Sequence, residues 1–132
     1  MTLEIPEEYC ASQPHLELNR LFSGWYITEF EGSSFQACPD EPVPLTLRYR
    51  ASAMDTLGLW GTPTWVELAP RAAEFLRHSE PPAQDSSRNR WFVRWYGTLR
   101  GPGTYGHMGG SSYSLYVDSM VLAKTPRATD CQ

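Results

Sequence analysis

Alternation of apolar and polar side chains is the feature of this sequence that most limits its fold. The segment 91–99 alternates along its length, and Gly97 marks a bend or bulge within it. The residues expected on its buried face are Trp91, Val93, Trp95 and Leu99. The segment 112–123 shows the same pattern, with a buried face expected to hold Tyr113, Leu115, Val117 and Val121. A period of two residues is that of a half-buried strand, so both segments predict β-strands.

Two segments nearer the N-terminus predict further strands. The segment 22–30 is rich in β-branched and aromatic residues, which favour extended structure. The segment 43–49 alternates cleanly, and the residues expected to share its buried face are Val43, Leu45, Leu47 and Tyr49. Pro44 lacks a backbone N–H, so it would place the start of this strand at the edge of a sheet.

One stretch between these strands predicts a helix. Thr62 followed by Pro63 is a favourable helix start, and apolar residues then recur at helical spacing. Pro70 would split this stretch, so the helix that we expect runs from Pro70 to His78. The polar residues from Ser79 to Asn89 predict a surface loop.

These elements predict a mostly β fold with one or two short helices. A helix between early and late strands is typical of a small OB-like barrel, and a strongly bent antiparallel sheet is the other arrangement we expect. With 132 residues, the chain has the length of one ordinary domain. We therefore expect a single domain over residues 1–132, with a lead-in at 1–20 and a flexible, frayed tail at 125–132.

Charge and hydropathy limit the partners and the compartment. The formal net charge is −4 at a pI near 5.3, and Lys124 is the one lysine among 11 basic residues. General binding of nucleic acid, which needs clustered basic residues, is therefore disfavoured. No apolar run of membrane-spanning length occurs, so no membrane span is expected. The acidic start, 1–8, does not resemble a signal peptide, which predicts a cytoplasmic protein unless a leader was removed, in which case it is periplasmic or envelope-located.

Three cysteines allow at most one disulfide within the chain. They are Cys10, Cys38 and Cys131. Cys10 and Cys131 lie near the two ends of the chain, and chain ends are often close together in space. The spacing fits no zinc site, and reduced thiols without a role are the simplest interpretation.

Two segments resemble a group of small, uncharacterised bacterial proteins, often envelope-associated or lipoprotein-like. The first is Phe30-Glu31-Gly32-Ser33-Ser34-Phe35-Gln36-Ala37-Cys38, and the second is the Gly-rich stretch 97–109, followed by Tyr113 and Val117. In that group an FE-x-S-x-F-x-x-C strand precedes a G-x-L-x-G-P-G-x-Y-G-H-hydrophobic-G hairpin. The resemblance implies a small OB-like β barrel and no known reaction. Relatives of this kind usually carry an export signal or a lipid-anchor cysteine, neither of which is recognisable here.

The Gly-rich hairpin holds two candidate binding residues, Tyr105 and His107. Six glycines between positions 97 and 110 would let the backbone approach a ligand closely. However, the hairpin follows a strand and leads into another, whereas a phosphate-binding loop should open a helix. A shaped connection, in which His107 bonds backbone carbonyls, is the structural alternative.

Acidic, thiol and aromatic side chains supply the other candidates. Glu29 and Glu31 would lie on one strand face as a carboxylate pair, unless one of them pairs with an arginine such as Arg94 or Arg100. Cys38 would be a nucleophile only beside His107 and with a lowered pKa. Among the five tryptophans, Trp60 lies in an irregular stretch and is the best candidate for an exposed anchor. The binding residues that we predict are Glu31, Trp60, Tyr105 and His107.

Three classes of function remain open. A non-catalytic binding or protein-interaction domain of bacterial origin fits the resemblance and the aromatic content. An immunity or inhibitor protein that neutralises a toxin or effector fits the small size and the acidity. A small hydrolase-like enzyme would need Glu31, His107 and Cys38 to converge. We favour them in that order, with another protein as the partner, and we expect no catalytic set, metal or cofactor.

Overall fold

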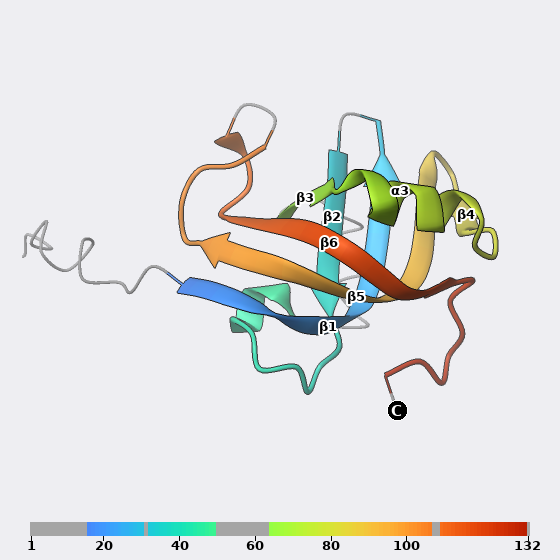
Figure 1. Ribbon diagram of the computed structural model, residues 1–132, viewed down its shortest axis with the longest axis horizontal. Helices are drawn as coiled ribbons and strands as arrows, with labels where there is room; N and C mark the ends of the chain where they lie inside the picture. The colour runs from blue at the N-terminus through green and yellow to red at the C-terminus, as the bar shows by residue number, and fades with distance from the viewer. Residues whose placement is uncertain (1–15, 31, 50–63, 107–108, 132) are drawn as a thin grey trace, which may run out of the picture.

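Residues 16–30, 32–49, 64–106 and 109–131 are described by the computed structural model of this chain (Figure 1). The elements within these residues are β1 (Leu16–Glu29), β2 (Gly32–Ala37), the 3-10 turn η1 (Leu45–Leu47), β3 (Thr64–Leu68), α3 (Pro70–Arg77), β4 (Ala83–Asp85), β5 (Arg88–Gly101) and β6 (Tyr113–Lys124). The prediction of a mostly β fold is therefore confirmed. None of the helices in these residues is long and apolar enough to cross a membrane.

Within the described residues, six strands form one mixed sheet in the order β2-β1-β5-β6-β3, and β4 pairs with β5. Every strand pair is antiparallel except β3 with β6, which is parallel. Of the two arrangements that we expected, the bent antiparallel sheet therefore differs from the structure in this one pair. The parallel pair arises because α3 and β5 lie between β3 and β6 in the chain and give the connection room to cross over.

The two outer strands of this order, β2 and β3, come close without pairing. The Ser33 hydroxyl of β2 donates a hydrogen bond to the Val66 carbonyl of β3 at 2.9 Å. No backbone ladder joins the two strands in the part of the chain that is described, so the sheet is bent round but not closed. Ser33 is also hydrogen-bonded to the hydroxyl of Tyr26 on β1.

The inner face of the bent sheet holds the main hydrophobic core. Its largest fully buried side chains include Phe22, Phe35, Trp95, Leu99 and Leu115. The buried face predicted for 91–99 is confirmed by Val93, Trp95 and Leu99, with Trp91 packed at its margin. β1 begins at Leu16 rather than at Phe22, because Leu16 and Leu18 also pack against this core.

The buried face predicted for the segment 112–123 is confirmed only as far as Val117. Leu115 and Val117 are fully buried, but Val121 is 52% exposed. The pairing of β5 with β6 changes register between Arg94 and Trp95 and again between Tyr96 and Gly97. Each shift adds one residue to β6, and this reverses the face of the residues that follow. Met120 and Ala123 take the buried positions instead.

The strand predicted for 43–49 is wrong. The chain turns there instead, and η1 is closed by a bond from the Leu47 N–H to the Pro44 carbonyl at 2.9 Å. Val43 and Leu47 are buried but Leu45 is 58% exposed, so the alternation in the sequence does not correspond to one buried face. Pro42 and Pro44 cannot donate to a ladder, which favours a turn over a strand.

The helix and the loop after it differ in how well they were predicted. α3 begins at Pro70 and ends at Arg77, one residue short of the predicted end. The expected surface loop 79–89 instead contains β4, which forms a tight hairpin with the start of β5. Ser86 in the hairpin turn has a φ of 56°, a left-handed conformation found in such turns.

A second, smaller core covers part of the outer face of the sheet. Trp25, Ile27, Cys38 and Phe92 are buried there, and the C-terminal segment 125–131, the tail, packs over them through Cys131. Cys38 and Cys131 form a disulfide, with their Cα atoms 5.5 Å apart. The interpretation of Cys38 and Cys131 as reduced thiols is therefore wrong, and so is any pairing of Cys131 with Cys10.

Polar contacts also hold the tail. Asp130 pairs with the Lys124 ammonium at 2.5 Å and accepts a bond from the Arg127 N–H at 2.6 Å. Thr125 donates to the Pro81 carbonyl at 2.6 Å. Side chains of residues 125–131 thus contact the sheet and the segment before β4.

Removal of the disulfide is expected to destabilise the protein substantially. The bond closes a loop of 93 residues, and the chain-entropy treatment gives about 4.5 kcal/mol for a loop of this size, within a usual range of roughly 2 to 5. Urea unfolding of the Cys38→Ser/Cys131→Ser variant should show this loss, whereas Cys10→Ser should unfold like the wild type. Equal unfolding midpoints with and without reductant would contradict the assignment.

Ionisation of Tyr26 should lower stability only at high pH. Burial raises the pKa of Tyr26 to about 12, and the hydrogen bond with Ser33 offsets a smaller part. Because the unfolded-state pKa of 10.0 is lower, the contribution of Tyr26 is complete below pH 10 and is lost as the pH rises towards 12. The total is about 2–3 kcal/mol. Tyr26→Phe should flatten the loss of stability over that interval in unfolding measurements, while titration of Tyr26 with the exposed tyrosines would refute the effect.

Candidate functional site

Of the four predicted binding residues, the structure places Tyr105. Glu31, Trp60 and His107 lie outside the described residues. Tyr105 pairs with Ser111 across the connection between β5 and β6, through backbone bonds of 2.8 and 3.0 Å. In Figure 1 this connection lies at the opposite end of the sheet from the tail.

The Gly-rich connection is shaped by close contacts with aromatic rings. A Cβ at Gly103 would lie 2.9 Å from the Tyr105 ring, and one at Gly106 would lie 2.5 Å from the Trp65 ring. Gly106 also has a φ of +77°, which favours glycine. These glycines are therefore needed for packing, which agrees with the structural alternative for this hairpin.

The structure bears on the thiol candidate and on the arginines expected near the carboxylates, whereas Glu31 and His107 lie outside the described residues. Cys38 is in the disulfide, so it is not available as a nucleophile. The arginines proposed as partners of Glu29 or Glu31 have other contacts, because Arg94 donates to the Ser23 hydroxyl at 3.1 Å and Arg100 lies 3.6 Å from Glu17. No group of three metal-binding side chains occurs among the residues that the structure describes.

An exposed aromatic face on β5 and β6 was not predicted. Tyr96 and Tyr116 are each 47% exposed, and they point outward because their neighbours Trp95, Leu115 and Val117 point into the core. The two tyrosines lie on paired strands, where Tyr116 is opposite Thr98 and Tyr96 is opposite Ser119. Val121, the extra residue of β6 at the first register shift, is also exposed. We call Tyr96, Tyr116 and Val121 the tyrosine face.

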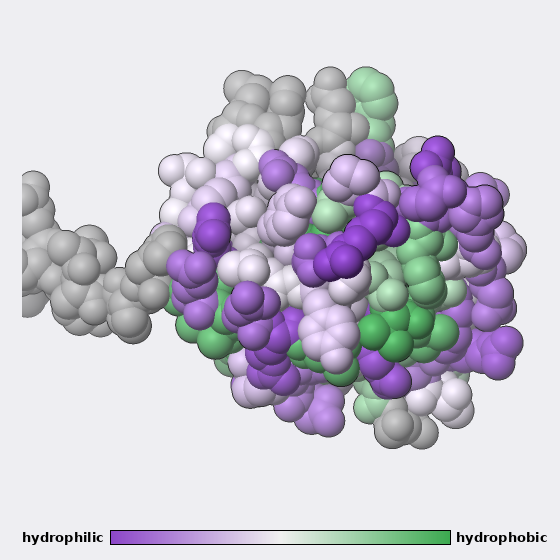
Figure 2. All heavy atoms as spheres, viewed as in Figure 1, coloured by the Kyte–Doolittle hydropathy of each residue, from purple (hydrophilic) through white to green (hydrophobic). Residues whose placement is uncertain are grey.

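Charged pairs frame the tyrosine face. Arg71 of α3 donates to the Asp118 carbonyl at 2.9 Å and to its carboxylate at 2.5 Å. The pair of Arg100 with Glu17 lies on the side of β1. Figure 2 shows these strands from outside, with an apolar patch among hydrophilic side chains near α3. The face thus combines two tyrosine rings and an exposed valine with charged pairs around them, and protein interfaces likewise have a polar rim.

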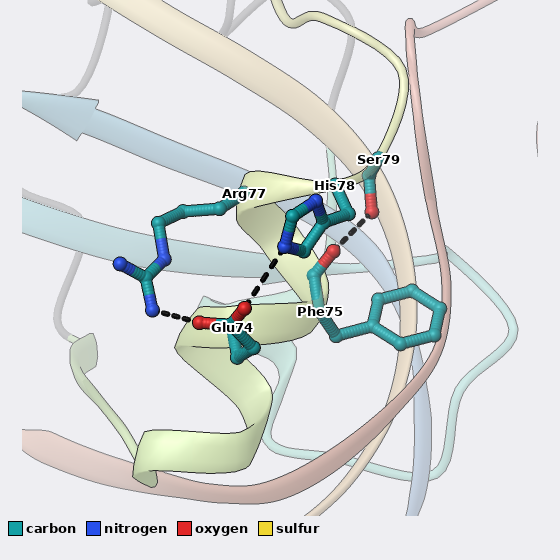
Figure 3. Close-up of polar contacts among 5 residues, drawn as sticks. All are labelled: Glu74, Phe75, Arg77, His78 and Ser79. Carbon is teal, nitrogen blue, oxygen red and sulfur yellow. Dashed lines mark hydrogen bonds and ion pairs between the residues drawn. The ribbon is translucent and has the colours of Figure 1, made fainter.

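The end of α3 carries a small exposed ionic group (Figure 3). Glu74 is bonded to the His78 ring at 2.9 Å and also to the Arg77 guanidinium, and the Ser79 hydroxyl donates to the Phe75 carbonyl at 2.8 Å. The hydrogen bond from His78, followed by the charge of Arg77, lowers the pKa of Glu74. His78 is exposed, and these groups lie at the last turn of the helix.

Titration should separate the two contributions to the Glu74 pKa. In His78→Ala the pKa of Glu74 is expected to rise towards its ordinary value, because the bond from His78 is the largest cause of the lowering. Arg77→Gln should have a smaller effect in the same direction. Because the folded-state pKa is lowered, the group stabilises the helix above the ordinary carboxyl pKa, and this is lost on acidification. Carboxyl-carbon NMR is the measurement, and an unchanged pKa in His78→Ala would contradict the contact.

Comparison of this chain with models of known protein families, with curated proteins and with solved structures found no match. The resemblance of the 30–38 and 97–109 segments to small bacterial envelope proteins therefore stays a prediction.

Proposed function

We propose that this chain is a non-catalytic protein-interaction domain that binds its partner through the tyrosine face. The observation that carries the proposal is the pair of half-exposed tyrosines, Tyr96 and Tyr116, on two paired strands of the sheet. Tyrosine is enriched at the energetic centres of interfaces because it offers a large apolar ring and a hydroxyl with few rotatable bonds.

The setting of the two tyrosines lowers the cost of binding. β5 pairs with β1 on one side and β6 on the other, and β6 also pairs with β3. Their backbones are therefore held on both sides, so little backbone order remains to be gained when a partner binds. Tyr96 and Tyr116 stand above buried Trp95, Leu115 and Val117, which support the strands from beneath.

An OB-like arrangement is the fold that we propose for this domain. The strand order, the parallel pairing of β3 with β6 and the place of α3 between β3 and β5 all support it. The contact of Ser33 with Val66 between β2 and β3 occurs where such a barrel would close. OB-like barrels serve many functions, so the fold supports binding only in general terms.

Protein is a better partner for this surface than nucleic acid. OB domains hold oligonucleotides on the face of their second and third strands. The outward side of β3 here carries Trp65, whose indole N–H donates to the Glu67 carboxylate at 3.2 Å. An exposed carboxylate repels phosphate, whereas the net charge of −4 favours a partner with a basic rim.

Loss of the two tyrosines should abolish capture of the partner. Tyr96→Ser and Tyr116→Ser are each expected to weaken binding by about tenfold or more, because hot-spot truncations commonly cost this much. Both side chains are exposed, so circular dichroism and unfolding of the variants should match the wild type. The measurement is affinity capture from native cell extract with quantitative mass spectrometry, followed by titration of the captured protein.

Phe30→Ser is the matched control. Phe30 is 86% exposed at the turn between β1 and β2, away from the tyrosine face, so its loss removes an exposed aromatic ring without touching the proposed site. Capture that survives in Phe30→Ser and fails in the double tyrosine variant supports the proposal. Capture that is equal in all variants, or that is lost only in Phe30→Ser, would refute it.

A further inference from the structure

A hollow of about 440 Å³ opens on the outer side of the sheet beside the disulfide. We call it the disulfide hollow. Its walls come from the second core, from β5 and from the tail, and they are formed by Trp25, Pro39, Tyr49, Arg90, Pro126, Arg127, Ala128, Asp130 and Cys131. The tail thus forms one wall, and the Cys38–Cys131 bond fixes that wall in place.

Arg90 differs from the other arginines of β5. Arg88 lies 3.3 Å from Asp85, Arg94 donates to Ser23, and Arg100 lies near Glu17. Arg90 lies opposite Ile27, and its Nε atom is buried with no hydrogen-bond partner among the described residues. The buried Nε is out of reach of a ligand, so an acceptor that enters the hollow would bind to the terminal nitrogens of the Arg90 guanidinium, which lines it.

The charge around Arg90 is positive. Asp130 also lines the hollow, but its carboxylate is already bonded to the Lys124 ammonium at 2.5 Å and to the Arg127 N–H at 2.6 Å. Arg127 lies 4.0 Å from Glu80, which is the limit for an ion pair, and both side chains are largely exposed. An anion is therefore the ligand that this lining favours.

Two aromatic rings also line the hollow. Trp25 and Tyr49 pack against each other with ring centroids 4.1 Å apart and planes inclined by 38°. Pro39 and Pro126 add further apolar side chains to the lining. A planar apolar group would bury its area against these side chains while an attached acid group reached Arg90.

We infer that the disulfide hollow binds a small aromatic carboxylate. The carboxylate accepts hydrogen bonds from the Arg90 guanidinium, the aromatic ring packs against Trp25 and Tyr49, and the tail forms one wall of the site. This site is separate from the tyrosine face and does not depend on the proposed partner.

A second hollow of about 350 Å³ on the other side of the tail does not compete as a site. Three of its charged side chains, Glu41, Lys124 and Asp130, already form ion pairs within the protein. Glu41 pairs with Arg20 at 3.2 Å and accepts from the Ser23 N–H at 2.9 Å, and Lys124 is bonded to Asp130. These contacts secure the turn after β2 and the tail.

Benzoate is the probe for the aromatic carboxylate, with acetate and inorganic phosphate as separate arms. The full chain with its disulfide intact is titrated by NMR, and the side-chain Nε–H signals of Arg90 and Arg88 are followed together. Benzoate should shift the Arg90 signal in a saturable way and leave the Arg88 signal in place. Acetate should bind at least about tenfold more weakly, because it lacks the ring that packs on Trp25 and Tyr49.

Arg90→Gln and Arg88→Gln form a matched pair of variants. Both remove one positive charge from the same strand two residues apart, but only Arg90 lines the hollow. Arg90→Gln should weaken benzoate binding about tenfold or more, and Arg88→Gln should leave it unchanged. Absence of saturable binding, equal losses in both variants, or binding of phosphate or acetate as tight as that of benzoate would each overturn the inference.

Discussion

The antiparallel pairing of β1 with β5 is the constraint on which the rest of the structure depends. It runs without interruption from Leu16 opposite Gly101 to Thr28 opposite Asn89. Because side chains alternate along both strands, this register places Phe22 and Trp95 together inside and Trp25 and Phe92 together outside. A slip of one residue would exchange the two sets and leave neither core intact. Both faces of β5 are therefore specified by one set of backbone bonds.

The outer core needs a cover, and the tail supplies it. Trp25, Ile27 and Phe92 would present a large apolar surface if the chain ended at β6. The disulfide and the Lys124–Asp130 pair keep the tail over these side chains, so the sheet is covered on both faces at this end. Further along β5 and β6 the same outer surface is exposed, and it carries Tyr96 and Tyr116. The disulfide hollow and the tyrosine face thus differ because the tail reaches one and not the other.

The order of apolar, polar and proline residues predicted an element correctly where that order reflects how the element itself packs or begins. Alternation found β5 because its inner face is buried along its length, and Pro70 located the start of α3 because proline suits a first helical turn. The same alternation was misleading at 43–49, where proline favours a turn. It also failed at Val121, because a β-bulge depends on the partner strand. The pairing of Cys38 with Cys131 depends on residues 93 positions apart, which no local pattern reports.

The candidate sites were harder to predict than the fold. Each depends on a side chain that other described residues neither bind nor cover. In the sequence, Arg90 is one of several arginines in a basic strand, and Tyr96 is one more aromatic residue beside Trp95. Alternation does place Tyr96 on the outward face, but it does not say whether another element covers that face. For Arg90, what matters is that Asp85, Ser23 and Glu17 lie within reach of its neighbours and not of it. Whether a residue is available to a ligand thus depends on the whole fold. Here the tail forms a wall of the disulfide hollow and does not reach the tyrosine face.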